Sequence, residues 1–211
     1  MADKHNGQTD SLLLGILSRF SESAKSNVTR IAINDFISMA KETLSELREV
    51  DTLLTQISKE IGGLSKSDLK KLGSDAFDIA SNYGKSAADY LTEVQNASRA
   101  GYQNAAQIAE LSLAAQSAGN LTRELTDRFI TATDQAYGLG GSVSKLTEIL
   151  DGSFNISGRN AISMAELAEA MSAAGEQTSQ LGIGADETAA VLGPIISGAH
   201  QSGAEASEAS E

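Results

Sequence analysis

The chain has 211 residues, enough for one or two ordinary domains, and 16 Lys and Arg against 28 Asp and Glu give it a formal net charge of -12. This balance excludes the basic surface that nucleic-acid binding needs, and the absence of cysteine excludes disulfides, thiolate metal sites and cysteine nucleophiles. Aromatic residues are only 4% of the chain, tryptophan is absent and proline occurs once, so thin layers of long helices suit this composition better than a deep core or a loop-rich fold.

Residues 1–62 are expected to form a helical lead-in. The first ten residues are polar and are expected to be disordered, and a helical pattern of apolar side chains begins at about Asp10 or Ser11. The short apolar run from Leu12 to Leu17 lacks a basic leader and a small-residue cleavage site, and it is too short to span a bilayer. We therefore expect neither a signal peptide nor a transmembrane segment here.

A longer helix follows, with an apolar stripe at spacings of three, four or seven residues. The stripe is formed by Ala40, Leu44, Leu47, Leu54 and Ile61, and is widened by Val50 and Ile57. Such a stripe needs a partner, either another helix or another copy of the chain, so a coiled coil and self-association are both open. Asp51 and Ser58 occupy positions along the seam and argue against a long regular coiled coil.

The sequence "IGGLSKSDLKKLG", residues 61–73, predicts a domain boundary. Gly62 and Gly63 can end a helix in a left-handed conformation, and Ser65 or Ser67 can begin the next one. A second helical domain is expected over residues 63–203. The acidic, low-complexity end, residues 204–211, is expected to be a flexible tail.

Helices in the second domain are separated by glycines. They are predicted over 67–82, 86–100, 103–118, 121–137, 142–150, 163–180 and 185–197, with breaks at Gly84, Gly101, Gly119, Gly138 and Gly182. The pairs Ser86–Asp89 and Ser163–Glu166 have the spacing of capping boxes. Residues 151–161 are predicted to be the one substantial loop, and Pro194 to kink or end the last helix.

No segment shows sustained alternation of apolar and polar residues, so no strand is predicted. The expected fold class is all-α: an array of amphipathic helices rich in alanine and leucine, joined by short glycine turns, with a long N-terminal helix.

Two glycine-containing sequences resemble parts of nucleotide-binding motifs. In "NYGKS", residues 82–86, the first glycine of a phosphate loop is replaced by Ile79, and a helix precedes where a strand is required. A helix end at Gly84 and a serine cap at Ser86 explain the same residues. "LGIGADE" offers Gly182 and Gly184 but no third glycine, and is interpreted as a tight turn between helices.

The support in the sequence for a metal-binding site is also weak. Asp151, Ser153 and Asn155 supply oxygen atoms as a calcium loop does, but the required glycine and closing glutamate are missing, and a solvated loop is favoured. The two histidines, His5 and His200, fall in ends that are expected to be flexible.

The remaining polar candidates lie in and after the predicted loop. Glu166 and Glu169 are adjacent on one helix and are interpreted as a cap and a solvated residue in preference to ligands. Arg159 and Asn160 are interpreted as loop hydrogen-bonding or partner-contact residues. No catalytic, cofactor-binding or metal-binding residue is assigned, and the chain is not expected to be an enzyme.

The order of these turns and helices resembles the core region of phage tail tape measure proteins of the TP901-like family. The resemblance covers about residues 65–205. It is carried by Tyr83, Gly84, Ser86, Asp89 and Tyr90, and then by Asn155, Ser163, Leu167, Ala168, Ala170, Gly182, Asp186 and Glu187.

The resemblance implies a structural role without catalysis. Proteins of this family are extended, mostly helical chains around which the tail tube polymerises, and tail length follows their length. Multiple copies, tail tube protein and assembly chaperones are the implied partners, and the virion tail lumen and the host cytoplasm the implied locations. An unbroken helix of 211 residues reaches about 315 Å, and family members are commonly longer, so a fragment or a short relative is expected. The alternative is a bacterial coiled-coil interaction or adaptor module.

Overall fold

The computed structural model describes residues 45–61 and 64–208, which form helices and the turns between them. The chain divides into two units, residues 1–48 and 49–211. Residues 45–61 form one helix. The helices that follow are α3 (Lys66–Asn82), α4 (Ala87–Arg99), α5 (Ala105–Gly119), α6 (Arg123–Tyr137), α7 (Val143–Arg159), α8 (Met164–Gln180) and α9 (Ala185–Glu208). The described residues contain no strand, which confirms the all-α fold class.

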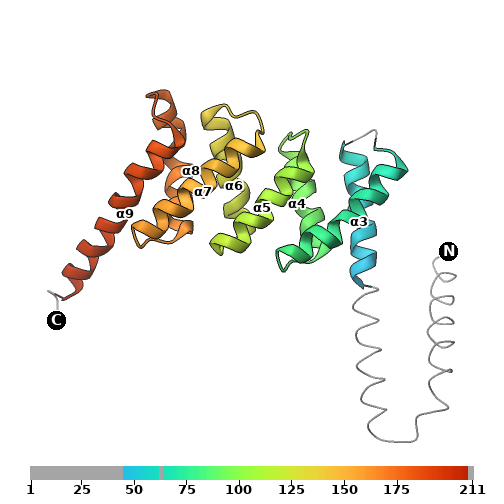
Figure 1. Ribbon diagram of the computed structural model, residues 1–211, viewed down its shortest axis with the longest axis horizontal. Coiled ribbons are helices and arrows are strands. Elements are labelled where there is room, and N and C mark those ends of the chain that lie inside the picture. Colours follow the sequence, from blue (N-terminus) through green and yellow to red (C-terminus); the bar gives the residue numbers. More distant parts are fainter. Residues whose placement is uncertain (1–44, 62–63, 209–211) are drawn as a thin grey trace, which may run out of the picture. The chain divides into compact units, whose positions relative to one another are not determined.

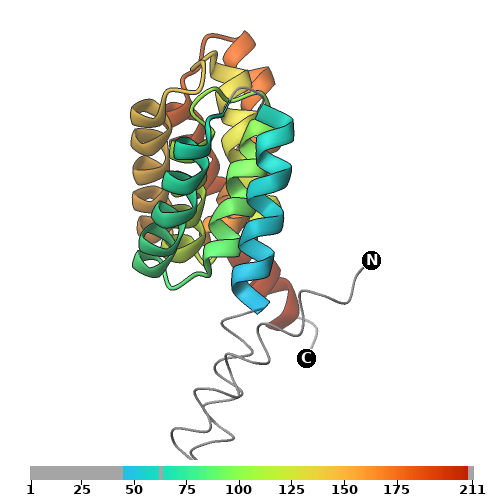
Figure 2. The ribbon, with the colours of Figure 1, turned by 90° about the vertical axis from the view of Figure 1, so that its right-hand side faces the viewer.

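Within the unit 49–211, each helix packs mainly on neighbours that are close in chain order (Figure 1). The pairs α3–α4, α4–α5 and α5–α6 are in contact, α6 packs most closely on α8, and α9 packs on α7 and α8. A view turned by 90° shows the helices of this unit running roughly alongside one another (Figure 2). The predicted array of helices is therefore present in the described part of the chain.

Short turns with a left-handed residue end several helices. Gly84, Gly138 and Gly182 have φ values of 65°, 60° and 78°, in the region that L side chains rarely adopt. At the end of α5 this role falls to Asn120, with φ 49°, one residue after the predicted break at Gly119. Asparagine tolerates this conformation better than other non-glycine residues.

Capping boxes that start with a serine begin three of the helices. Both predicted capping boxes are present: Ser86 with Asp89 begins α4, and Ser163 with Glu166 begins α8. Of the two candidates at the start of α3, Ser65 is the cap, in a third box with Asp68. In each box the serine hydroxyl accepts a hydrogen bond from a backbone N–H, and the carboxylate accepts one from the N–H of the serine.

The core is built from small and aliphatic side chains with few large ones. Its largest fully buried side chains include Tyr90 and Phe129. Where aromatic rings meet helices, glycine leaves the space: a Cβ atom on Gly119 would lie 2.7 Å from a ring atom of Phe154. The helices of this core therefore gain contacts by approaching one another closely, and not by burying many large side chains.

The predicted loop at residues 151–161 is wrong, because α7 continues as a helix to Arg159. Two glycines and several residues with low helix propensity led to that prediction. Tertiary packing overrides the propensity: Ser153 and Ser157 are buried, and the Ser153 hydroxyl lies 3.4 Å from the sulfur of Met171 in α8. The small side chains let α7 lie close to its neighbours.

The last helix is longer than predicted, since α9 passes through Pro194 and continues to Glu208. Proline has no N–H to donate to the carbonyl of Ala190, four residues earlier. Pro194 lies on the exposed side of α9, where water can take the place of that donor, whereas Gly193 beside it is buried. Packing on one side of α9 thus offsets the lost hydrogen bond.

The apolar stripe of the helix 45–61 is centred differently from the prediction. Val50 and Ile57, predicted only to widen the stripe, are 5% and 0% exposed, whereas Leu47 and Ile61 are 48% and 40% exposed. The partner of this face belongs to the same chain, because Leu54 lies against Gly73 of α3. Ala40 and Leu44 lie outside the described residues, as do the predicted boundary glycines.

The helix 45–61 is also tied to α4 by polar contacts. Arg99 donates to Glu60 at 2.7 Å, and Gln95 donates to Glu60 at 2.8 Å and to Gln56 at 3.2 Å. Among the helices of the described residues, none is long and apolar enough to cross a membrane.

Candidate functional site: a buried polar network around Glu93

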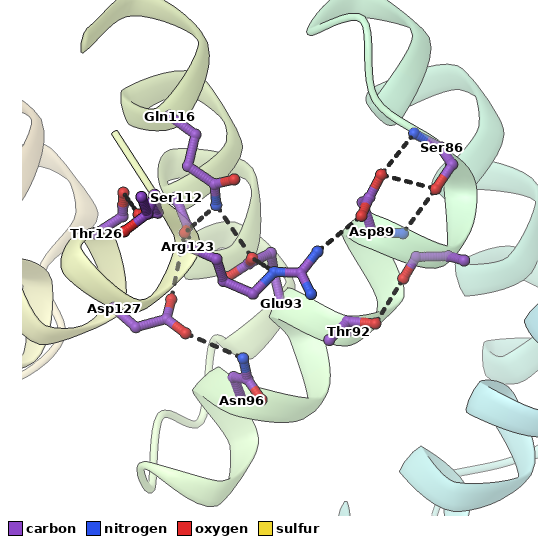
Figure 3. A network of polar contacts seen from close by, with 12 residues as sticks. Ser86, Asp89, Thr92, Glu93, Asn96, Ser112, Gln116, Arg123, Thr126 and Asp127 are labelled. Atoms are coloured by element: carbon purple, nitrogen blue, oxygen red, sulfur yellow. Dashed lines mark hydrogen bonds and ion pairs between the residues drawn. The ribbon is translucent and has the colours of Figure 1, made fainter. Parts of the chain in front are cut away.

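A group of charged and polar side chains lies between α4, α5 and α6 (Figure 3). Each helix contributes side chains spaced by three or four residues, so that those of one helix lie on one face. The members are Asp89, Glu93 and Asn96 of α4, Ser112 and Gln116 of α5, and Arg123 and Asp127 of α6. We call this group the Glu93 network.

Glu93 is at its centre and only 1% exposed. Its Oε1 atom accepts hydrogen bonds from Nε of Arg123 at 2.7 Å and from Nε2 of Gln116 at 3.0 Å. Its Oε2 atom accepts from the Ser112 hydroxyl at 3.0 Å. A carboxylate removed from water needs such a full set of donors, because burial without partners costs several kcal/mol (roughly).

Arg123 joins two carboxylates. Its Nη2 atom donates to Oδ1 of Asp89 at 2.7 Å while its Nε atom binds Glu93, and Figure 3 shows the guanidinium between the two acids. Asp89 also accepts hydrogen bonds from Ser86, the residue it caps. The cap of α4 is therefore continuous with the Glu93 network.

Asp127 brings a further negative charge. Its Oδ2 atom accepts from Asn96 at 3.0 Å, and its Oδ1 atom, 3.4 Å from the Ser112 hydroxyl, shares the single hydrogen of that hydroxyl with Glu93. The Glu93 network thus holds three carboxyl groups and one guanidinium, which pairs with Asp89 and Glu93. This excess of acid favours a proton on one of them.

Ionisation is opposed most clearly at Glu93. Burial, together with the hydrogen bond and the negative charge of Asp127, raises the pKa of Glu93 to about 7, although Gln116 and Ser112 lower it. Burial opposes ionisation of Asp89 too, but its hydrogen bonds from Ser86 and the charge of Arg123 outweigh it and lower the pKa of Asp89. The pKa values of these two acids of one network are therefore shifted in opposite directions.

A small cavity adjoins the network. It has a volume of about 60 Å³ and is lined by Glu93, Asn96, Ser112 and Asp127 together with apolar side chains and Tyr102. This space is large enough for a few water molecules, whereas sites for small organic molecules typically measure several hundred Å³ (roughly). Glu93 can exchange a proton with water that enters this space.

Larger hollows also lie on the surface, and the one beside the start of α9 is lined by Lys145, Glu148, Asp186 and Glu187. One of about 420 Å³ lies between α6 and α8 and is lined by small and polar residues, and another of about 500 Å³ lies beside the start of α9. Among the residues that the structure describes, no three His, Asp or Glu side chains are arranged to hold a metal ion.

No family model, no curated protein and no solved structure matches the chain. What the site can do chemically is therefore inferred from its own residues alone.

Several polar candidates from the sequence have the structural roles that were predicted. Gly84 follows the end of α3, and Ser86 is the cap of α4. Gly182 and Gly184 lie in the tight turn between α8 and α9. Glu166 accepts from the backbone N–H of Ser163 at 2.9 Å, which confirms its interpretation as a cap.

Glu169 and His200 are found on opposite helices of the C-terminal part. Glu169 is 65% exposed and lies 3.8 Å from Arg128, which confirms that it is a solvated residue. The prediction that His200 belongs to a flexible end is wrong, since it lies on α9 with its Nε2 atom 2.9 Å from Glu166. His5 lies outside the described residues.

The candidates from the predicted loop all lie on or beside α7. Asp151 and Asn155 are exposed on one side of the helix, whereas Ser153 is buried on another, so their oxygen atoms do not converge. Arg159 is the last residue of α7. Asn160 follows it, and its side chain donates to the carbonyl of Ile156 at 2.9 Å.

Sequence reasoning missed the Glu93 network. Acidic residues at a spacing of four, such as Asp89 and Glu93, are typical of a solvated helix face, and α4 carries other polar residues around them. The partner Arg123 is 30 positions further along the chain, after a turn. Only the packing of α4 on α5 and α6 reveals that Glu93 is buried.

Proposed function

We propose that the chain is a segment of a phage or prophage tail tape measure protein, which occupies the lumen of the tail tube and helps to set tail length. The proposal extends the ordered resemblance of residues 65–205 to that family. It involves no catalysis. Tail tube protein, assembly chaperones and further copies of the chain are the proposed partners, in the host cytoplasm during assembly and in the virion afterwards.

The observation that supports this function best is the order of helix contacts. Each helix from α3 to α9 packs mainly on helices next to it or next but one in the chain. An array of this kind can be drawn out step by step from one end, since separating one helix leaves the packing of distant helices intact. A protein stored in a narrow tube and later expelled needs this property.

The chemistry of the Glu93 network is compatible with a structural role. Its donors and acceptors are satisfied by one another, and each buried side-chain nitrogen or oxygen in the described part of the chain has a hydrogen-bond partner. A network of this kind fixes how three helices fit together. We infer that it sets the register of α4, α5 and α6 without acting on a substrate.

A helical interaction or adaptor module is the second candidate. It is favoured by the exposure of Val191 and Ile195 on α9, which are 58% and 60% exposed. An adaptor would use such a surface to bind a cellular partner and would not be packaged.

The location of the chain separates these two functions. Intact virions from the phage or induced prophage that encodes the chain would be purified, and their tails analysed by mass spectrometry before and after genome ejection. A tape measure segment is expected in full tails and lost from emptied ones, while the tail tube protein, as the internal control, remains in both. Absence of the chain from full tails contradicts the proposal and favours the adaptor.

A further inference from the structure

The helices of the unit 49–211 form two groups, one on each side of the turn at residues 120–122. Before this turn α4 packs closely on α3 and α5, and after it α6 packs closely on α8, with α9 on α7 and α8. Between the groups, α5 packs less extensively on α6 and α7. We call the described residues from 49 to 119 the first group, and residues 123–208 the second group.

Both ends of α5 are held to the second group. At its C-terminal end, Gly119 lies against the ring of Phe154 in α7. At its N-terminal end, the side chain of Asn104 donates to the carbonyl of Gly141, in the turn before α7, at 3.0 Å. The contact of α5 with α7 therefore does not depend on the Glu93 network.

The Glu93 network joins α4 to α6 (Figure 3). Arg123 of α6 binds Asp89 and Glu93 of α4, and Asp127 of α6 accepts from Asn96 of α4. These two helices are not a closely packed pair, and the cavity of about 60 Å³ adjoins the bonds between them. Polar side chains, and not close packing, thus hold α4 to α6.

The network needs a proton to complete its set of donors. The Ser112 hydroxyl lies 3.0 Å from Oε2 of Glu93 and 3.4 Å from Oδ1 of Asp127, and it can donate its single hydrogen to only one of them at a time. A proton shared between the two carboxyl groups supplies the missing donor. Its loss leaves two negative charges that repel each other between α4 and α6.

The other groups around Glu93 do not remove this repulsion. The guanidinium of Arg123 carries one charge and already pairs with Asp89 as well as Glu93. The titratable and charged groups that face Glu93 or line the adjoining cavity are Asp89 of α4, Arg123 and Asp127 of α6, and Tyr102 before α5, while α5 itself contributes the neutral Ser112 and Gln116.

We propose that the Glu93 network is a proton-dependent latch between the two groups. With the shared proton the latch is closed; without it α4 moves away from α6 while α5 stays on α7. The separated carboxylates gain water through the adjoining cavity, which replaces the donor that was lost. The latch responds near neutral pH, because burial and Asp127 raise the pKa of Glu93 to about 7.

Single-molecule energy transfer between two dyes tests this movement. The chain has no cysteine, so dyes can be attached at two introduced ones. Lys70→Cys on α3 and Gln135→Cys on α6 place one dye in each group, at exposed positions. As pH rises from about 5 to about 8, the ratio of open to closed molecules should rise about tenfold or more, because Glu93 then loses its proton.

Two further dye pairs report on each group alone. Lys70→Cys with Gln107→Cys lies within the first group, and Gln135→Cys with Ala190→Cys lies within the second, all at exposed positions. Both of these distances should stay constant over the same pH range. A change in either would show that the fold loosens as a whole, and would overturn the proposal.

Three variants identify the group that titrates. Glu93→Gln should keep the latch closed at both pH values, because the glutamine amide supplies a donor and does not titrate. Asp127→Asn should also keep it closed, since it removes the repelling charge. Glu169→Gln, at an exposed acid of α8, is the matched control and should open as the native chain does.

A distance between the groups that does not change with pH overturns the proposal. An unaltered response in Glu93→Gln also overturns it, because another group then titrates, such as His200, which contacts Glu166. The movement is measured on the purified chain and does not depend on the function in tail length, so either proposal can fail without the other.

Discussion

The carboxyl group of Glu93 links the stability of the fold to pH. Its pKa is raised from the ordinary 4.5 to about 7 by burial and by Asp127. Between these values the folded chain holds a proton that the unfolded chain has released, so protonation stabilises the fold. This contribution is fully present below pH 4.5, about the unfolded value, and is lost as pH rises through about 7. The lowered pKa of Asp89 acts below its ordinary value of 3.8, outside this window.

We therefore expect stability to fall by roughly 1–3 kcal/mol as pH rises from about 5 to about 8. Glu93→Gln should remove most of this dependence, because glutamine has the shape of the protonated acid and does not titrate. Urea unfolding followed by circular dichroism across this pH range measures both chains. Glu169→Gln, at an exposed acid, should retain the native dependence. A flat native profile, or the same slope in Glu93→Gln, would contradict the assignment of the proton to Glu93.

At the level of residues, the sequence predicted local roles and missed distant ones. The capping roles of Ser86 and Ser163 depend on residues three positions away, so their spacing is visible in the sequence. The role of Glu93 depends on Arg123, which reaches it only after α5 has folded back between them. Burial of a charged residue depends on tertiary packing, and the spacing of residues along a helix does not indicate it.

At the scale of elements, the close approach of α7 and α9 explains both departures from the predicted helix boundaries. A Cβ atom on Gly193 of α9 would lie 2.7 Å from Cγ2 of Ile156 and 2.8 Å from Nδ2 of Asn160. Asn160 is held by its hydrogen bond to the Ile156 carbonyl, so it cannot move away easily. Gly193 lets the two helices approach each other closely. Their contact keeps both of them helical through segments whose residues have low helix propensity.

Two glycines of α9 provide a matched test of this contact. Gly193→Ala should destabilise the fold by about 1–3 kcal/mol, because the new methyl group has no space. Gly198→Ala should stabilise it by about 0.5–1 kcal/mol, since nothing lies within 4 Å of that position and alanine is the better helix former. Urea unfolding of the native chain and the two variants gives the comparison. Equal effects at the two positions would show that α7 and α9 are not in this close contact.

Helix existence was more predictable than helix ends. Strong local signals, the serine caps and the left-handed glycines, place the start of α8 and the end of α6 within a residue or two of the prediction. The end of α7 was predicted from weak helix formers alone, and the buried faces of Ser153 and Ser157 outweigh them. The contacts that decide this belong to other helices and cannot be seen in the segment itself.

At the scale of the whole molecule, the amino-acid composition and the order of helix contacts are consistent with each other. A chain with 4% aromatic residues has to gain stability from the close packing of many small side chains. Within the unit 49–211 those contacts join helices that are near in chain order. The sequence predicted this all-α array, because glycine punctuation and amphipathic spacing recur along it, but it did not predict which helices pack together.

The proposed function predicts that tail length changes with the length of this chain, so tail length is the property to measure. In the gene that encodes the chain, residues 87–119, which comprise α4 and α5, would be duplicated or deleted in frame, and the tails of the proposed phage measured by electron microscopy. At about 1.5 Å per residue, 33 residues correspond to about 50 Å of helix. We expect tails about 50 Å longer after duplication and about 50 Å shorter after deletion. Tails of unchanged length in both cases would contradict the proposal that this chain helps to set tail length.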